Sequence, residues 1–520
     1  MNTTKVSTKN NWPIAVGILI VLAVVFCKLP YWFAHPLAIH ADQSVYLAMA
    51  DLLLKGKKLY VDIFDFNPPL IIYLNTIPVV LANLINRPVI QVFNLSIYFL
   101  MLLSTTLTAA IFYANRQASD RYLFFPLLLA PVVCTQTQFY DFGQREHLFI
   151  LLYFPFFVCR ILRYQSGNIP TALAVTAGIL AAIGVSLKPQ FFLTALILEA
   201  SLAWQWRSIK LFGSVENKIC ALLTAVYLLH FVLLGQQSLS VLFDQAWPIY
   251  SNGLSYFHIG FIEGLASLSS FSYPYYLLAL AMSLAFALQG RSCWFLPATT
   301  FTLISLLSML QAGSIWTYRG IPLQLGCLIL IALSAGVGLE ALFNYKARMA
   351  APTLAALVCS AVLCFCQVWA PANTDYDFDL AQIGYSGRAP SSDLSLLVPS
   401  IIAHSQIGDR VIYIGRGVRP GYPSILQAHR HPGSRYLHGM ILPMLVVCIE
   451  KDPSRFKPML DLVIANYGQD VLTNKPKLIF IDDIFVAPLF AQRRFIEKYM
   501  TNYELIEHID QAACTVYRSK

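Results

Sequence analysis

Two aspartates stand where a carboxylate can act on a substrate at a membrane surface. Asp42 follows the first apolar run closely, in "HADQ", and Asp141 lies in "FYDFGQREHL", directly before another apolar run. Placing a carboxylate at the middle of a membrane costs about 2.5–3.5 kcal/mol of free energy. A carboxylate near the membrane is therefore expected either to have a function or to be solvated. A positioned carboxylate can take a proton from an attacking hydroxyl. The alternative is a solvated loop aspartate, and this is how we interpret Asp51, Asp62 and Asp65.

Isolated cations stand at the edges of other apolar runs. Arg145 lies in "GQREH", Lys188 in "LKPQ" and Arg319 in "WTYRGIP". Fixed positive charges beside carboxylates suit a reaction on an anionic lipid head group. Simpler roles stay open, because Lys188 and Arg319 can extend to the membrane interface, and Arg145 and Glu146 can form ion pairs with each other or with a neighbour.

The composition shows that these residues stand against an apolar background. Of the 520 residues, 57% are hydrophobic and 12% are charged, and the mean hydropathy is +0.60. Soluble proteins carry about 25% charged residues. The chain is therefore a polytopic α-helical membrane protein, and its net charge of +9 reflects orientation in the bilayer, not nucleic-acid binding. Most cysteines lie within apolar runs, and none has zinc-ligand spacing.

Apolar runs of spanning length predict about 11 transmembrane helices. The predicted spans are 12–31, 90–113, 122–138, 147–164, 170–187, 190–206, 219–235, 273–289, 293–311, 321–340 and 350–370. We read the first run as a retained span. Segment 70–86 is short and contains Pro78 and two asparagines, so we predict an interfacial or re-entrant helix.

The basic loops support that choice. With 70–86 not counted as a span, the loops that carry lysine and arginine all face the cytoplasm together with the N-terminus, as membrane proteins prefer. These loops are 115–121, 160–168, 207–218, 290–292 and 345–349. Asp42, Asp141, Lys188, Arg319 and the C-terminus then share the outer face.

The last part of the chain changes character after Pro371. Short apolar runs such as "RVIYIG" and "KLIFID" alternate with charged and Pro/Gly-containing stretches, a pattern typical of a soluble α/β domain. We predict a transmembrane catalytic domain over 1–370, which includes an outer loop 32–69 and the interfacial helix 70–86. We predict an outer α/β domain over 371–520. Its histidines lack metal spacing, so its role is acceptor binding, a lid or structural support.

The order of these features resembles the GT-C glycosyltransferases. A first span, an outward loop "YLAMADLLLKGKKLYVDIFDFNPPL" with an early Asp, and a second outward Asp before another span are similar to that family, most clearly over residues 38–190. "WTYRGIP" and "SRYLHGM" look like segments of bacterial members. The family uses polyprenyl-phosphate sugars and includes protein O-mannosyltransferases and lipid A aminoarabinose transferases.

The resemblance implies an inverting sugar transfer to a lipid, glycan or protein acceptor. Asp42 would be the general base with Asp141 assisting, and Lys188, Arg145 and Arg319 would bind the donor phosphate. Residues in supporting roles would be His40, Gln43, Asn67, Glu146, His147 and Tyr318. The chain departs from the family at Gln43, where relatives often have an acid, and at Asn67, where they often have a lysine, so another cation must serve.

Cofactor, location and rival functions follow from the same pattern. We predict no obligatory metal, because Gln43 removes one carboxylate and hard cations prefer several oxygen ligands; a divalent ion between Asp42 and Asp141 stays an alternative. We expect a bacterial inner membrane with the C-terminal domain in the periplasm. The rival functions are a transporter or flippase of a lipid-linked sugar, which would place charges at mid-membrane and show two similar halves, and a nonenzymatic scaffold.

Overall fold

The computed structural model describes most of the chain. It covers residues 41–115, 121–136, 141–264, 292–311, 316–343 and 396–520, together with the single residues 39, 138 and 313. The predicted spans 12–31, 273–289 and 350–370 lie outside the described residues. So do His40 and the predicted domain boundary at Pro371.

The described helical bundle follows the remaining predicted spans. Its helices are α4 (Val89–Asn115), α5 (Arg121–Gln136), α6 (Arg145–Ser166), α7 (Thr171–Ser186), α8 (Pro189–Gln205), α9 (Val215–His230), α14 (Ser292–Gln311) and α15 (Ile321–Phe343). Among the described residues, four helices are long and apolar enough to cross a membrane, and shorter apolar helices accompany them. The expectation of a helical integral membrane protein is confirmed, whereas the number of spans stays a prediction.

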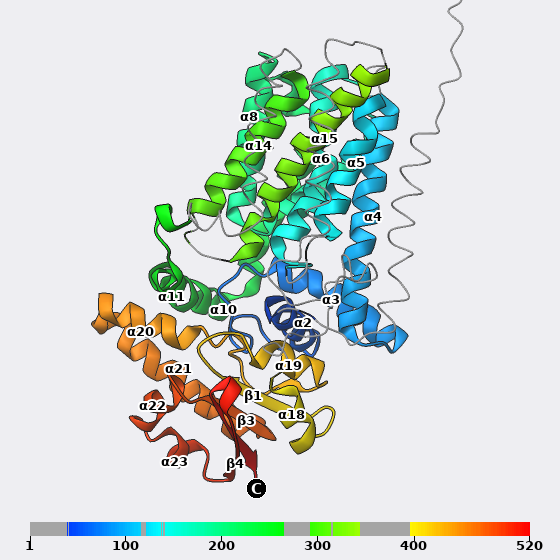
Figure 1. The fold of residues 1–520 in the computed structure, drawn as a ribbon. Coiled ribbons are helices and arrows are strands. Elements are labelled where there is room, and N and C mark those ends of the chain that lie inside the picture. The colour runs from blue at the N-terminus through cyan, green and yellow to red at the C-terminus, as the bar shows by residue number, and fades with distance from the viewer. Residues whose placement is uncertain are drawn as a thin grey trace, which may run out of the picture.

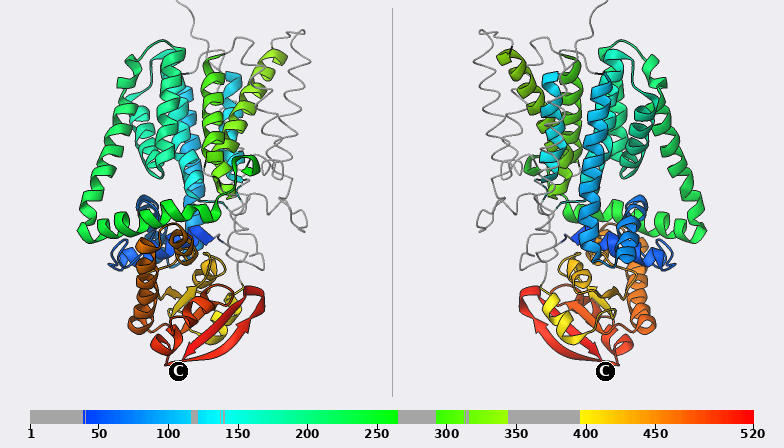
Figure 2. Two further views of the ribbon diagram at one scale, coloured as in Figure 1. Left: turned by 90° about the vertical axis from the view of Figure 1, so that its left-hand side faces the viewer. Right: turned by 90° about the vertical axis from the view of Figure 1, so that its right-hand side faces the viewer.

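Burial divides the bundle into a core and a lipid-facing side. Helix α6 is almost entirely enclosed, and its Phe149 and Tyr153 pack inside the bundle. Helix α9 exposes Leu222, Leu228 and Leu229. Leucines that are exposed on such a helix can contact lipid. Helix α9 lies at the periphery of the bundle (Figure 2).

Two helices, α2 and α3, lie between the bundle and the C-terminal domain (Figure 1). Helix α2 (Ala41–Leu54) is buried from Gln43 to Ala50. Helix α3 (Leu70–Ile85) buries Ile72 on one face and exposes Leu84 on another. At 1.5 Å per residue, α3 is about 24 Å long, shorter than a bilayer core. Its placement at the interface stays a prediction.

Residues 236–257 form a platform of short helices between the bundle and the C-terminal domain (Figure 1). They are α10 (Gln236–Ser240), the π-turn η3 (Val241–Ala246), α11 (Trp247–Gly253) and η4 (Leu254–Phe257). Lys451 Nζ donates to the Asn252 carbonyl at 2.6 Å, and Ser238 Oγ donates to the Leu59 carbonyl at 2.8 Å. The platform thus joins α20 (Ile441–Lys451) to the loop that follows α2.

The C-terminal domain contains a mixed five-stranded sheet in the order β2-β1-β3-β5-β4. The strands are β1 (Arg410–Ile414), β2 (His431–Pro432), β3 (Leu478–Asp482), β4 (Tyr503–Ile509) and β5 (Cys514–Ser519). β1 runs parallel to β2 and β3, and β5 runs antiparallel to β3 and β4. The predicted α/β character is confirmed, since "RVIYI" and "LIFID" form adjacent buried strands.

Helices surround this sheet and complete the domain. They are α18 (Val398–His404), α19 (Gly421–Gln427), α20 (Ile441–Lys451), α21 (Pro453–Asn474), α22 (Val486–Ala491) and α23 (Phe495–Tyr499). In both views of Figure 2 the domain lies at one end of the bundle, beside α2 and the platform. That end also carries the candidate site.

Candidate active site

Gln144 hydrogen-bonds to both Asp42 and Asp141. Asp42 begins α2, and its Oδ2 accepts a hydrogen bond from Gln144 Nε2 at 3.2 Å. Asp141 lies in the turn before α6, and its carbonyl accepts from the Gln144 backbone N–H at 3.1 Å. Two carboxylates that are distant in sequence therefore meet at one place. The sequence analysis overlooked Gln144, which links them.

The Asp141 carboxyl is buried among other acids. Burial raises its pKa to about 7; a hydrogen bond from Thr317 opposes this rise, and the charges of Glu146 and Asp42 add to it. Asp141 and Asp42 are thus close enough for one charge to affect the other. A carboxyl with this pKa changes its protonation state near neutral pH.

The "WTYRGIP" segment reaches the same place. Residues Thr317–Gly320 form the 3₁₀ turn η5 ahead of α15, and Thr317 Oγ1 donates a hydrogen bond to Asp141 Oδ2. The Arg319 guanidinium lies 4.9 Å from the ring centroid of Trp316, whose ring stacks on Tyr318. Thr317 is a second residue that the sequence analysis overlooked.

Arg145 contacts Asn67, where the family resemblance led us to expect a lysine. An Arg145 Nη1–H donates to Asn67 Oδ1, and the guanidinium carbon lies 5.7 Å from the Tyr46 ring centroid. Asn67 Nδ2 in turn donates to Asp65 Oδ1 at 2.9 Å. The first residue of α6 therefore places a cation next to Asn67, which lies in the loop before α3.

Lys188 forms a buried ion pair with Glu146. Its Nζ contacts Glu146 Oε1 and lies 5.2 Å from the Tyr318 ring centroid. Both side chains are buried, so Lys188 does not extend into the interface. Glu146 therefore pairs with a neighbouring residue, Lys188, which is the simpler alternative stated above.

Gln43 and His147 hold the turn that carries Asp141. Gln43 Nε2 donates to the Phe142 carbonyl at 2.9 Å. His147 Nδ1 accepts from the Gly143 N–H at 2.9 Å, so Nε2 carries the proton and donates to Thr135 Oγ1 at 3.1 Å. Gly143 has a φ of +77°, and a Cβ there would lie 2.3 Å from the Phe93 ring. This position requires glycine.

Among the described residues, several buried polar atoms of the site have no hydrogen-bond partner. They are Asp65 Oδ2, Gln144 Oε1, Arg145 Nε, Glu146 Oε2 and both ring nitrogens of His438. Buried polar groups are nearly always paired in native proteins. A cluster of unpaired donors and acceptors beside two carboxylates therefore has the capacity to bind a polar ligand.

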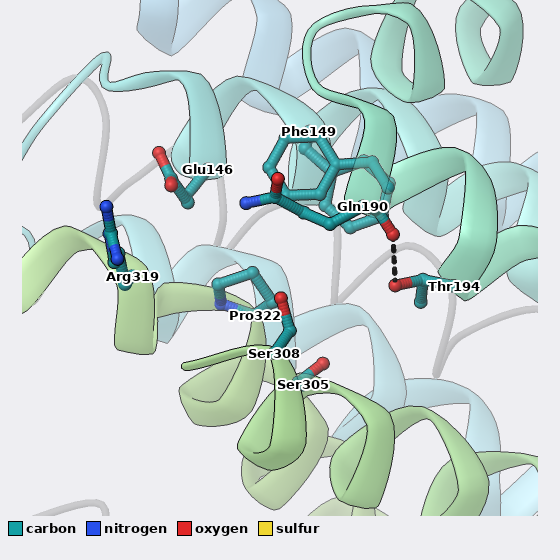
Figure 3. A pocket seen from close by; sticks show the side chains of 9 residues that line it. Glu146, Phe149, Gln190, Thr194, Ser305, Ser308, Arg319 and Pro322 are labelled. Carbon is teal, nitrogen blue, oxygen red and sulfur yellow. Dashed lines mark hydrogen bonds between the residues drawn. The ribbon is translucent and has the colours of Figure 1, made fainter. Parts of the chain in front are cut away.

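A small cavity lies next to this cluster (Figure 3). Its volume is about 10 Å³, which is room for about one water molecule. Its wall combines aromatic, hydroxyl and charged side chains: Glu146, Phe149, Gln190, Phe191, Thr194, Ser305, Ser308, Arg319 and Pro322. Glu146 and Arg319 lie on one side of it, and Thr194 and Ser305 lie on another. The cavity is therefore too small for a lipid chain.

The C-terminal domain also reaches the site. His438 Nε2 lies 3.5 Å from Asp65 Oδ1, and the charge of Arg419 acts on Asp141. Asp65 was expected to be a loop aspartate, and the histidines lack metal spacing, so this contact was not predicted from the sequence. Among the described residues, no three His, Cys, Asp or Glu side chains converge as metal ligands, and metal dependence stays a prediction.

The structure matches solved membrane proteins along almost its whole length. ArnT from Cupriavidus metallidurans in the apo state aligns with a TM-score of 0.53 and 11% identity, over 97% of this chain and 98% of that chain. The chain has the GT-C fold. ArnT from the same organism bound to undecaprenyl phosphate aligns with a TM-score of 0.50 and 10% identity, over 98% of each chain. No family model and no curated protein matches the sequence. The GT-C fold expected from residues 38–190 is thus confirmed for the chain, and at this identity the likeness concerns the fold alone.

Proposed function

We propose that this protein is an inverting glycosyltransferase. It moves a sugar from a polyprenyl-phosphate carrier to a lipid, glycan or protein acceptor at the end of the bundle that carries the C-terminal domain, which we place at the outer face of a bacterial inner membrane. The observation that carries the proposal is the convergence of Asp42 and Asp141 with the cations Arg145 and Lys188. ArnT, which shares the fold, has been crystallised with undecaprenyl phosphate.

Asp42 is the general base in this mechanism. Its carboxylate takes the proton of an acceptor hydroxyl while that oxygen attacks the anomeric carbon of the donor sugar. A new C–O bond forms on one face of the ring as the bond to the lipid phosphate breaks on the other. Gln144 fixes Asp42 through the 3.2 Å hydrogen bond, and Asp141 assists by helping to orient the acceptor.

The cations stabilise the departing phosphate, which takes the electron pair of the broken bond. Arg145 has an unpaired Nε–H, and arginine binds phosphate through paired N–H groups. Lys188 and Arg319 add positive charge near Tyr318 and Trp316. Such preorganised charge is worth most where water is excluded.

The apolar parts of the site suit a lipid-linked donor. Helix α3 exposes Ile77 and Leu84 and forms a wall of a lateral entrance from the bilayer.

Reconstituted transfer tests the proposal. The full-length protein in proteoliposomes should move radiolabelled sugar from an undecaprenyl- or dolichyl-phosphate donor, and Asp42→Asn should reduce transfer about 10²–10⁴-fold without changing the unfolding temperature. Asp51→Asn is the matched control, because Asp51 lies on the same helix and pairs with Lys55 at 2.7 Å. Wild-type transfer by Asp42→Asn would remove Asp42 from the mechanism. Lipid-linked sugar that crosses the bilayer with no transfer would favour a flippase.

A further inference from the structure

We propose that Asp65 and His438, one from each domain, form a positioning pair that sets Arg145 through Asn67. The C-terminal domain would then complete the donor-phosphate site. This inference rests on the proposed function. It concerns two residues that the mechanism above does not use.

The pair is enclosed and incompletely bonded. Asp65 is 0% exposed and His438 is 4% exposed, and His438 Nε2 lies 3.5 Å from Asp65 Oδ1. That same Oδ1 accepts from the Phe66 N–H at 2.7 Å and from Asn67. A buried carboxylate is costly unless donors surround it. His438 Nε2 forms no hydrogen bond among the described residues, and its 3.5 Å separation from Asp65 Oδ1 places it to act as a further donor.

Asp65 determines which end of the Asn67 amide faces Arg145. A carboxylate only accepts hydrogen bonds, whereas an amide has one end that donates and one that accepts. Asn67 therefore turns its Nδ2 toward Asp65, at 2.9 Å. This leaves Oδ1 to accept the hydrogen bond from Arg145. Without an acceptor at residue 65, this hydrogen bond no longer holds the Asn67 amide in this orientation.

The C-terminal domain delivers His438 on a fixed segment. The Phe64 N–H donates to the Arg435 carbonyl at 3.0 Å, and Phe64 forms a parallel bridge with Tyr436. Arg435 Nη2 bonds Asp470 on α21 at 2.8 Å. The His438 ring then meets the Tyr46 ring edge-on, with centroids 6.4 Å apart. The docking of the two domains thus places the imidazole against Asp65.

Phosphate binding tests the pair without requiring sugar transfer. Undecaprenyl phosphate is the probe, and its affinity for the full-length protein in detergent is measured for wild type and variants. His438→Ala should weaken binding about tenfold, because Asp65 then loses the imidazole that lies 3.5 Å from its Oδ1. His438→Gln should restore most of the affinity, because its amide nitrogen can occupy the place of Nε2. Asp65→Asn should weaken binding similarly while keeping the side-chain volume, so it tests the pair even where His438→Ala folds poorly.

A second cross-domain contact of the same type is the matched control. His431 Nδ1 lies 3.7 Å from Asp51 Oδ2, also between the C-terminal domain and the region of α2, but the His431 side chain is 45% exposed. His431→Ala should leave binding unchanged. An equal loss in His431→Ala and His438→Ala would show that only domain docking matters, and this would overturn the positioning role.

A double variant separates positioning from mere packing. If His438 acts through Asn67, Asn67→Ala with His438→Ala should bind no more weakly than Asn67→Ala alone. Losses that multiply, or wild-type binding by His438→Ala, would overturn the inference. Wild-type protein that binds undecaprenyl phosphate but transfers no sugar would instead overturn the proposed function. Transfer that depends on Asp42 but not on His438 would overturn the pair alone.

Discussion

The bundle contains two buried charge clusters, one toward each end, and they are bonded differently. The first joins α6, α8 and α9 through Arg160, which is fully buried. Arg160 Nε donates to Glu199 Oε1 at 2.6 Å and Nη2 donates to Oε2 at 2.9 Å. Nη1 reaches Glu216, which Arg163 also binds at 3.0 Å. Every carboxylate oxygen of this cluster has a partner.

The second cluster is the candidate active site, and it is left incomplete. In the part of the chain that the structure describes, three buried atoms have no hydrogen-bond partner: Glu146 Oε2, Arg145 Nε and Gln144 Oε1. A saturated network holds three helices in register, whereas an unsaturated one retains donors and acceptors for a ligand. Both clusters are charged and buried, so these two properties do not distinguish a structural cluster from a functional one. The clusters differ in whether hydrogen-bond donors and acceptors remain for a ligand.

The largest expected effect breaks the saturated cluster. Arg160→Met leaves Glu199 and Glu216 buried without their shared partner and should cost about 3–5 kcal/mol of unfolding free energy. Thermal unfolding in detergent measures this loss. Adding Glu199→Gln and Glu216→Gln should recover part of it, because no uncompensated charge remains. An Arg160→Met protein as stable as wild type would contradict the structural role of the cluster.

The next effect concerns the incomplete cluster. Arg145→Gln should lower kcat/KM about 10²-fold, as loss of a preorganised charge does, and should lower stability less than Arg160→Met. Transfer kinetics and thermal unfolding on the same preparations give both values. If Arg145→Gln destabilised the protein without a catalytic loss in the folded fraction, the two clusters would not differ in role.

The third prediction uses the protonation of Asp141. Since its pKa is raised to about 7 in the folded protein, the folded state binds more protons than the unfolded state between the two pKa values, and stability falls as pH rises through that range. Asp141→Asn removes the buried charge and should be roughly 2 kcal/mol more stable than wild type at pH 8, yet less active. Wild-type kcat/KM should rise with pH through about 7. Identical stability profiles for the two proteins would contradict the raised pKa.

The smallest effect concerns one hydrogen bond. Thr317→Val removes the donor to Asp141 and should cost about 1 kcal/mol. Because that hydrogen bond lowers the pKa of Asp141, its loss should move the rise of kcat/KM to higher pH. A pH–rate profile of the variant measures the shift. A shift to lower pH would contradict the contact.

The sequence predicted the bundle well because helix length and apolar content are local properties. The predicted span 190–206 corresponds to Pro189–Gln205, and 90–113 corresponds to Val89–Asn115. Pro189 lacks a backbone N–H and so suits the first turn of a helix. The two apolar runs of the C-terminal domain likewise became the adjacent strands β1 and β3. Each of these features depends on consecutive residues.

The sequence also nominated Asp42, Asp141, Arg145 and Lys188, because isolated charges beside apolar runs are conspicuous. It did not give their partners. Gln144 beside Asp42, Thr317 beside Asp141 and His438 beside Asp65 are contacts between segments separated by many residues. A hydrogen bond depends on a few ångströms of separation and on direction, and helix packing sets both. The chain by itself therefore determined which charges the membrane protein carries, and only the tertiary structure decided which of them are satisfied and which remain available to a ligand.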